Sequence, residues 1–147
     1  MKIRELFEAI ELTGEQVRKV SEEMIQDVLR IIRENTNLKK VGEGSNYPRF
    51  PYCAGGINLN HREEGKVKLS VVVYLEPGYA FVDLLKIPEE YQGKGLGKKI
   101  MEAVLKNLPD GFTVRYDDYN VPKEEGGQSF WEKLSERNPK LNWQRRR

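Results

Sequence analysis

A glycine-rich junction over residues 92–97, QGKGLG in one-letter code, is the feature that most restricts the fold of this sequence. It joins a strand-like segment, residues 80–87, to a helix-like segment, residues 98–108. Glycines at alternate positions let the backbone adopt positive φ angles and let a ligand approach the main chain without meeting a Cβ. Free amides at the start of the helix and the positive end of its dipole favour a bound anion. The junction therefore predicts a phosphate-binding turn.

The spacing of this junction excludes two well-known phosphate sites. A P-loop needs a glycine five positions before Gly97 and a Ser or Thr after its lysine, but residue 92 is Gln and Lys98 is followed by Lys99. The dinucleotide fingerprint needs a glycine at position 98 and an early parallel βαβ unit, and the sequence favours neither. Lys94, Lys98 and Lys99 add positive charge, so a nucleotide-like cofactor is the first hypothesis.

The bulk composition indicates one folded domain. The chain has 147 residues, of which 38% are hydrophobic and 33% charged, with a net charge of +2. This length fits a single domain with its own core. The only compact basic block is RRR at residues 145–147. We interpret residues 138–147 as a solvated basic tail and expect no nucleic-acid partner, because a nucleic-acid reader needs a wider basic face.

Cysteine and histidine are nearly absent. Cys53 is the single cysteine, so no disulfide can form within the chain and a secreted, disulfide-stabilised fold is disfavoured. No apolar run approaches the roughly 18–20 residues that span a bilayer, and residues 1–5 do not resemble a signal peptide. We therefore expect a cytoplasmic protein without membrane contact and, with His61 as the only other soft ligand, without a metal site. His61 itself is interpreted as an exposed loop or strand-end residue.

The first half of the chain predicts a helix followed by a long loop. Thr13 and Gln16 match a capping box, and apolar residues recur at helical spacing from Val17 to Ile32. Residues 35–56 contain repeated Gly and Pro and predict an irregular loop. Its aromatic side chains form either a substrate lid or a cluster packed on the domain edge; they are Tyr47, Phe50 and Tyr52.

The second half predicts strands and helices in alternation. Residues 67–75 and 79–87 are separated by Glu-Pro-Gly and predict an antiparallel hairpin, next to which residues 57–60 add a strand. Both hairpin strands are apolar on both faces, as expected for central strands covered by helices on either side. A further strand over residues 112–116 and a last helix over residues 127–136 complete the pattern.

The junction resembles motif A of the GNAT superfamily of N-acetyltransferases, whose pattern is Gln or Arg, two residues, Gly, one residue, then Gly or Ala. Gln92, Gly95 and Gly97 fill the fixed positions, and residues 130–134, FWEKL, resemble a later helix signature of the family. The resemblance covers about residues 67–135. It implies a single α/β (α+β) domain with a mixed, mostly antiparallel central sheet and helices on both faces.

The resemblance implies acetyl-CoA as the cofactor. Its pyrophosphate would bind the backbone amides of the glycine turn, and its pantetheine arm would pair with the strand before the turn. The cofactor-binding residues implied in this way are Leu85, Ile87, Gln92, Gly93, Lys94, Gly95, Leu96, Gly97, Lys98 and Asn120.

The family's reaction is direct attack of an amine on the thioester carbonyl. Asp83 lies within an apolar strand, where burial would raise its pKa, so it is the candidate base, with a structural carboxylate as the alternative. The family's usual proton donor is a tyrosine where this chain has Trp131. Tyr119 is the candidate acid in its place and Tyr116 the second choice, although both tyrosines also suit packing roles.

The sequence says least about the acceptor substrate. The resemblance implies a small-molecule or peptide amine, and an acidic cluster of Asp117, Asp118, Glu124 and Glu125 would attract it. The acceptor site is open, completed by a partner chain as in a homodimer, or covered by the 35–56 loop. The alternative to an enzyme is a non-catalytic acyl-CoA-binding module that has lost the general acid.

Overall fold

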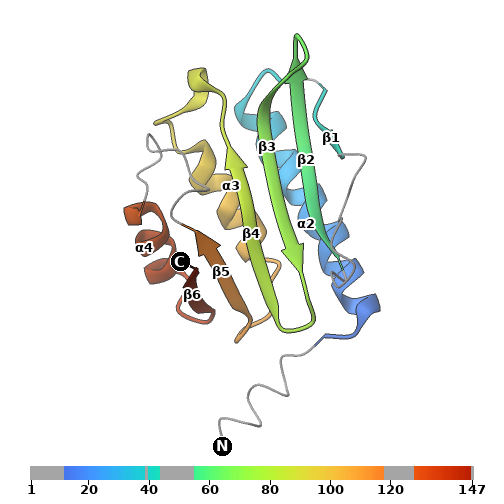
Figure 1. Ribbon diagram of the computed structural model, residues 1–147, viewed down its shortest axis with the longest axis vertical. Coiled ribbons are helices and arrows are strands. Elements are labelled where there is room, and N and C mark those ends of the chain that lie inside the picture. Colours follow the sequence, from blue (N-terminus) through green and yellow to red (C-terminus); the bar gives the residue numbers. More distant parts are fainter. Residues whose placement is uncertain (1–11, 39, 44–54, 118–127, 147) are drawn as a thin grey trace, which may run out of the picture.

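The structure is a computed structural model, which describes residues 12–38, 40–43, 55–117 and 128–146. Figure 1 shows a central sheet with helices packed behind it. In chain order the elements are α2 (Gly14–Asn35), β1 (Gly42–Glu43), β2 (Gly55–Glu63), β3 (Lys66–Leu75), β4 (Tyr79–Lys86), the 3-10 turn η1 (Glu89–Tyr91), α3 (Leu96–Leu105), β5 (Thr113–Asp117), α4 (Gln128–Arg137) and β6 (Asn142–Arg146).

The sheet is mixed, as the family resemblance implies. Its strands follow chain order from β1 to β6. β1 to β4 pair with one another in antiparallel fashion, whereas the β4–β5 and β5–β6 pairs are parallel. Parallel neighbours need a crossover connection, and α3 and α4 supply the two crossovers. The α/β class and the mostly antiparallel sheet are thereby confirmed.

The long helix α2 begins at the predicted capping box. The backbone N–H of Gln16 donates to Oγ1 of Thr13 at 3.1 Å, and the N–H of Thr13 donates to Oε1 of Gln16 at 2.8 Å. These two bonds satisfy amides that a helix start leaves free. The apolar stripe of the helix faces the core, and its fully buried members are Val17, Met24, Val28 and Ile32.

The described helices share one face of the sheet. A Cβ on Gly55 of β2 would touch Val17 and Ser21 of α2, so this side of β2 faces α2. Both crossovers move along the sheet in the same direction, and right-handed crossovers then place α3 and α4 on the same face. The ion pair between Arg137 of α4 and Glu102 of α3, at 2.9 Å, agrees with this arrangement. Helices on the second face, which the sequence predicts, are not among the residues that the structure describes.

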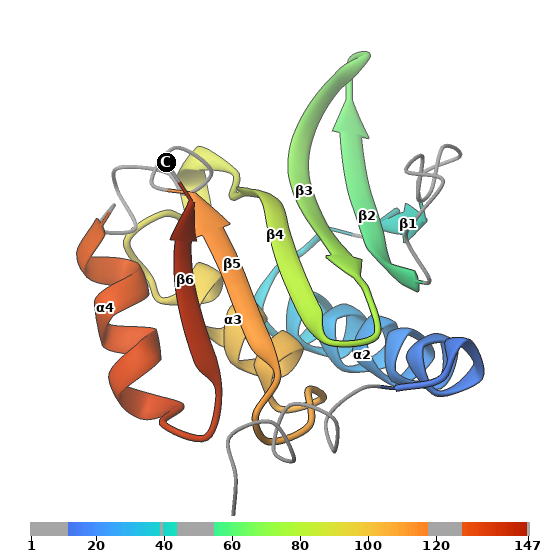
Figure 2. The same ribbon diagram turned by 60° about the horizontal axis from the view of Figure 1, so that its bottom comes forward.

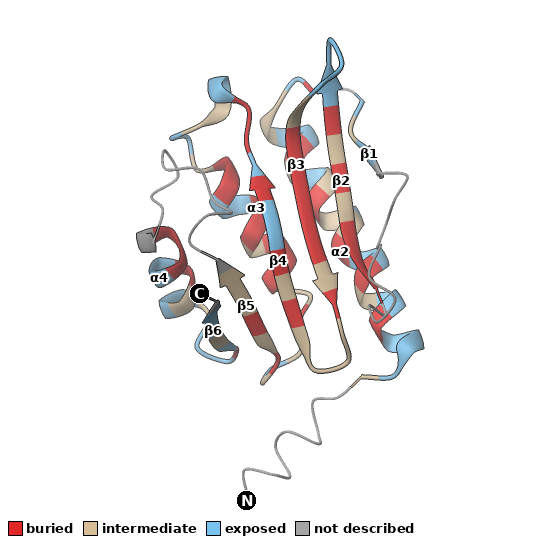
Figure 3. Cartoon of the chain, in the orientation of Figure 1, coloured by how far each residue is buried: buried red, intermediate tan, exposed pale blue. Residues whose placement is uncertain are grey.

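The buried residues concentrate where the sheet meets the helices. Figure 3 shows buried positions along β3 and on the inner sides of α2 and α3. Leu69 to Val73 are buried without interruption, so β3 is covered on both of its faces. This burial matches the prediction for the first strand of the hairpin, whereas Asp83, Leu84 and Lys86 of β4 are exposed, so the second strand is not covered on both faces along its whole length.

Three expectations from the sequence need correction. Of the expected loop at residues 35–56, Gly42 and Glu43 form β1 and residues 55–56 begin β2, while residues 44–54, with the three aromatic side chains and Cys53, lie outside the described residues. His61 is buried within β2, with Nε2 3.0 Å from the Glu63 carboxylate and Nδ1 3.3 Å from the carbonyl oxygen of Lys40.

The third correction concerns the C-terminal segment. Residues 142–146 are not a solvated tail but form β6, which pairs with β5 along the whole length of that strand. Figure 2 shows β6 beside β5 at one edge of the sheet, next to α4. Of the helices described in this chain, none combines the length and the apolar character needed to cross a membrane.

Candidate functional site

The glycine turn has the backbone conformation that its sequence predicts. Gly93 and Gly95 adopt φ angles of 74° and 83°. Residues that carry a Cβ rarely adopt these angles, which explains why both positions are glycine. A Cβ on either residue would meet no atom within 4 Å, so the space beside the turn is open to a ligand. Gly95 is also the N-cap of α3, which therefore starts at Leu96 and includes Gly97.

Several backbone amides at this turn come before the first residue whose N–H takes part in a hydrogen bond within α3. The N–H of Gln92 donates to the carbonyl oxygen of Glu89 at 3.2 Å, and the first backbone bond onto the N-cap runs from Lys99 N–H to Gly95 at 3.0 Å. A helix leaves the amides of its first turn without internal partners. The amides of Leu96, Gly97 and Lys98 are in this position and can donate hydrogen bonds to a bound anion.

Side chains anchor the turn to its neighbours. The amide of Gln92 donates from Nε2 to the carbonyl oxygen of Ile87 at 2.9 Å. The hydroxyl of Tyr91 accepts from the N–H of Asn37 at 3.0 Å, and Nζ of Lys99 donates to Oδ1 of Asn35 at 2.9 Å. The turn is thus tied both to the end of β4 and to the end of α2. Of the three lysines, Lys99 is engaged in this anchoring, whereas Lys94 and Lys98 are exposed.

β4 and β5 run side by side only at their starts. Their ladder consists of the pairs Tyr79–Thr113, Ala80–Val114 and Phe81–Arg115. β4 continues to Lys86 and β5 to Asp117 without further pairing between them. The two strands therefore stop pairing with each other on the side of the glycine turn. Residues 84–86 of β4 lie beyond the ladder with β5, where an extended ligand can pair as an added strand.

A β-bulge marks the same stretch of β4. Val72 of β3 pairs with Leu84 and Val73 with Val82, so Asp83 is the extra residue. Bulges redirect side chains and are frequent beside active sites. Asp83 is exposed, so the expectation that it is buried is wrong. Its role as a base therefore stays a prediction, and burial no longer supports it.

The neighbouring strand residues can serve a ligand through their backbone only. The side chains of Leu85 and Ile87 are 1% and 2% exposed and belong to the core. The carbonyl oxygen of Ile87 is already bound by Gln92. Tyr119 and Asn120 lie outside the described residues, as do Asp118, Glu124 and Glu125 of the acidic cluster.

An aromatic cluster lies on the helix side of β5. Trp131 of α4 is fully buried, and its ring stacks on Tyr116 with ring centroids 4.9 Å apart. Phe130 and Trp143 contact the same indole, at centroid distances of 5.2 and 6.4 Å. Tyr116, the second candidate acid, is therefore held by stacking at the point where β5 leaves β4. The sequence pattern shows apolar spacing here but not this stacking.

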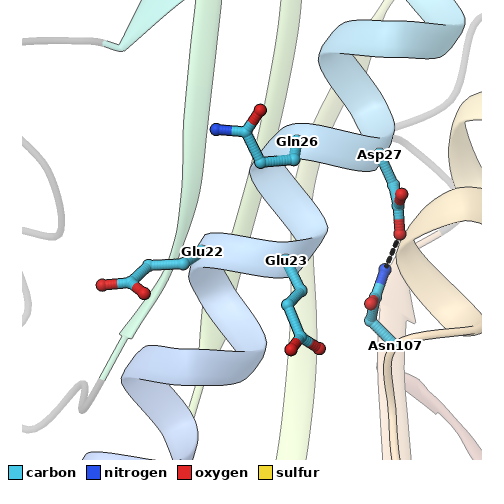
Figure 4. A pocket seen from close by; sticks show the side chains of 5 residues that line it. All are labelled: Glu22, Glu23, Gln26, Asp27 and Asn107. Atoms are coloured by element: carbon cyan, nitrogen blue, oxygen red, sulfur yellow. Dashed lines mark hydrogen bonds between the residues drawn. The ribbon is translucent and has the colours of Figure 1, made fainter.

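A shallow hollow elsewhere on the surface is not part of this site. It has a volume of about 610 Å³ and is lined by Glu22, Glu23, Gln26, Asp27 and Asn107. Figure 4 shows these side chains on α2 and after the end of α3, whereas the glycine turn precedes the start of α3. The hydrogen bond from Asn107, at 2.9 Å, lowers the pKa of Asp27, and the Lys106 ammonium adds to this effect. These contacts connect α2 with the segment after α3 and have a structural role.

No metal-binding group accompanies the turn. Among the described residues, no three His, Cys, Asp or Glu side chains lie together in a way that could hold a metal ion. The groups at the turn that can hold a cofactor are therefore backbone amides and lysine side chains.

The chain has a partial similarity to a known enzyme. Over 68 residues it is 37% identical to L-2,4-diaminobutyric acid acetyltransferase from Wolinella succinogenes. The match covers 40% of this chain and 39% of that protein, so the chain spans well under half of the relative's length. No family model matches the chain, and no solved structure gives a match. Part of this chain is thus similar to part of an acetyltransferase.

Proposed function

We propose that this protein is an acyl-CoA-dependent N-acyltransferase of the GNAT type, which transfers an acetyl group from acetyl-CoA directly to a primary amine. The observation that carries the proposal is that the glycine turn and the part of β4 beyond its ladder with β5 adjoin one another. The glycine turn follows β4 and η1 and opens α3, and that part of β4 leads from the turn to the place where the two strands pair. The partial similarity to an acetyltransferase supports acyl transfer in general.

Acetyl-CoA fits this arrangement in its charge and its length. Its pyrophosphate would bind the amides between Gln92 and Lys98, next to the exposed ammonium groups of Lys94 and Lys98. Its pantetheine arm carries amide groups that can pair with the β4 backbone near Leu85, as an added strand does. The thioester would then lie where the two strands converge.

The chain's own groups would align the acceptor amine and move its proton. Alignment of two reactants can lower the barrier by several kcal/mol. Asp83 is exposed at the bulge next to the gap and can receive the amine proton directly or through water. Tyr119 is the proposed acid for the departing thiolate. The acceptor is a small-molecule or peptide amine, and a homodimer contact is one way to complete its site.

Substitution of a turn glycine tests cofactor binding. Gly95→Trp fills the open space beside the amides of the first turn of α3, and we expect calorimetry to show that it abolishes CoA binding while circular dichroism shows a retained fold. Gly42→Trp is the matched control, because a Cβ there also meets no atom within 4 Å but lies on the far edge strand. Unchanged affinity in Gly95→Trp contradicts the proposed site.

An acceptor panel tests the transfer step. Thiol release from acetyl-CoA is measured with polyamines, amino sugars, peptide amines and 2,4-diaminobutyrate, the last chosen from the name of the similar enzyme. Turnover with any of these amines supports the enzyme. A non-catalytic acyl-CoA-binding module is the second candidate, because Trp131 cannot act as an acid where the family has tyrosine. Tight CoA binding without turnover across the panel favours that candidate.

The location in the cell is also a proposal. A cytoplasmic setting suits a chain whose single cysteine cannot form an internal disulfide.

A further inference from the structure

The face of the sheet opposite to the described helices carries a hydrogen-bonded row of polar side chains. Oγ of Ser70 in β3 donates to Oδ1 of Asn60 in β2 at 2.7 Å, and Nδ2 of Asn60 donates to Oδ1 of Asn58 at 2.7 Å. Gly55 lies against α2, and side chains alternate along a strand, so Asn58 and Asn60 point to the opposite face. Figure 1 shows the helices behind the sheet, and the row lies on the side turned to the viewer.

This row ends in an amide that donates to no described residue. Oδ1 of Asn58 accepts the bond from Asn60, so its Nδ2 keeps two N–H groups for another acceptor. Among the described side chains, the only buried nitrogen or oxygen atom without a hydrogen-bond partner is Nε1 of Trp131. Nδ2 of Asn58 is therefore open to solvent. Ser70, at the other end of the row, is 2% exposed and holds the amides in place.

The bulge in β4 places two neighbouring side chains on the same face of the sheet. Val82 and Leu85 are each 1% exposed and belong to the core. Asp83 and Leu84 lie between them and are both exposed, Leu84 to 37%. Because the bulge inserts one extra residue, the two consecutive side chains both point away from the helices. Figure 3 shows this exposed stretch towards the end of β4.

Strand register brings the polar row and the bulge together. Leu84 pairs with Val72, and Val72 pairs with Asn58, so these residues form one line across three strands. Neighbouring strands are about 4.8 Å apart, so the backbones of Asn58 and Leu84 are separated by about 10 Å. In the next line of the same face, Lys86 pairs with Ser70. A small molecule fits between the Asn58 amide on one side and the bulge on the other.

The charges around this space have opposite signs. Lys86 is exposed and forms no ion pair with a described residue. Asp83 lies two positions after Phe81, the last residue of β4 that pairs with β5. The carboxylate therefore lies near the place where we expect the thioester, while Lys86 and the Asn58 amide offer hydrogen-bond donors to an anionic group.

We propose that the acceptor amine belongs to an amino acid, whose carboxylate binds Nδ2 of Asn58 and Nζ of Lys86 while its reacting amine lies beside Asp83. The inference rests on the function proposed above and names the substrate class of the same site. Hydrogen bonds between charged groups are stronger than neutral ones, so the carboxylate gains from both donors. The carbon chain between the two ends lies on Leu84. Diamines and amino sugars have no carboxylate for these donors, so they are poorer acceptors.

Matched substrates test the need for a carboxylate. Thiol release from acetyl-CoA is measured with 2,4-diaminobutyrate and 1,3-diaminopropane, with ornithine and putrescine, and with lysine and cadaverine. The second member of each pair lacks only the carboxylate. We expect kcat/KM to be about tenfold higher, or more, for the amino acid in every pair that reacts.

The outcomes separate this inference from the proposed function. Equal rates within the pairs, or turnover only with diamines, amino sugars or peptide amines, overturn the inference and leave the transferase standing. Absence of turnover with every amine, although CoA binds, contradicts the proposed transferase itself.

Substitutions give the second measurement. Asn58→Leu and Lys86→Met remove the donors and keep side chains of similar length. We expect each to raise KM for the amino acid about tenfold with little change in kcat, because the carboxylate is remote from the reacting amine. KM for the paired diamine should change much less. Lys86 is exposed, so its variant keeps the test valid if Asn58→Leu does not fold.

A third substitution controls for surface charge. Lys66→Met removes the same charge at the exposed start of β3, outside the line of paired residues, and should leave both KM values unchanged. An unchanged KM for the amino acid in Lys86→Met overturns the inference. So does an equal rise in KM for the amino acid and the diamine, because that result would come from altered packing of the sheet face.

Discussion

The side-chain amide of Gln92 donates to the carbonyl oxygen of Ile87 across 2.9 Å, and this bond ties the glycine turn to the end of β4. A glutamine at the start of the turn pattern thus has a local structural reason. It fixes the direction in which the chain leaves the strand, and so the direction in which the amides of the turn point.

Removal of this bond should loosen the turn. Gln92→Met keeps the length of the side chain but has no N–H donor, and we expect about 1 kcal/mol lower stability and about fivefold weaker CoA binding. Denaturant unfolding and calorimetry measure the two effects.

A second amide in the chain serves as the control. Nδ2 of Asn142 donates to the carbonyl oxygen of Gly111 at 2.9 Å, away from the glycine turn. Asn142→Leu should lose similar stability without any loss of CoA affinity. If both variants weaken CoA binding equally, Gln92 has no special link to the site.

Gly95→Ala separates backbone strain from ligand contact. The variant forces a side chain into a φ of 83°, which should destabilise the fold by about 1 kcal/mol. Gly65 of the β2–β3 hairpin has a φ of 77° and the same open surroundings, so Gly65→Ala should lose about as much stability. Only Gly95→Ala places a methyl group beside the proposed phosphate site. If CoA affinity falls in both variants, or in neither, the phosphate does not bind beside Gly95.

The sequence predicted the turn well because its physical requirements are local. Positive φ at Gly93 and Gly95 and a helix that starts directly after them depend on adjacent residues only. Asp83 was interpreted as buried because its neighbours are apolar, but the bulge against β3 depends on pairing with a distant strand. Nε1 of Trp131, which has no hydrogen-bond partner among the described residues, is buried by packing between α4, β5 and β6, and no sequence pattern records this packing.

Gly56 is a second residue whose structural role depends on a distant strand and could not be predicted from the sequence. The sequence places it in an irregular loop, where glycine serves as a breaker, but it lies in β2 with a φ of 133°. A Cβ there would lie 2.0 Å from the carbonyl oxygen of Val73, so the residue is glycine because β3 passes too close. The reason for this glycine is a contact across the sheet, which sequence spacing cannot show.

Gly56→Ala should therefore be severely destabilising. The added methyl group has to displace the backbone of the central strand β3, and we expect a loss of about 3 kcal/mol or more. Gly42→Ala in β1 is the matched strand control, since its Cβ would meet no atom within 4 Å and should change stability by less than about 1 kcal/mol. Thermal unfolding of both variants measures the difference, and similar melting temperatures would refute the close approach.

Asp27 should make the stability of the chain depend on pH in the acid range. Hydrogen bonding from Asn107, with help from Lys106, lowers its pKa below the ordinary value of 3.8. A depressed carboxyl pKa contributes stability above the unfolded pKa, and this contribution is lost as the pH falls through the lower folded value. At neutral pH, Asp27→Asn should be about 1 kcal/mol less stable than wild type.

That deficit should disappear on acidification. Below the folded pKa of Asp27 the wild-type carboxyl is protonated as well, so urea unfolding near pH 2 should give nearly equal free energies of unfolding for wild type and variant. Asp110→Asn is the control, because the Asp110–Lys140 pair is 3.9 Å apart with both side chains 76% exposed and contributes little at any pH. A deficit of Asp27→Asn that is the same at pH 2 and pH 7 would show that the loss comes from packing and not from the charge of the carboxylate.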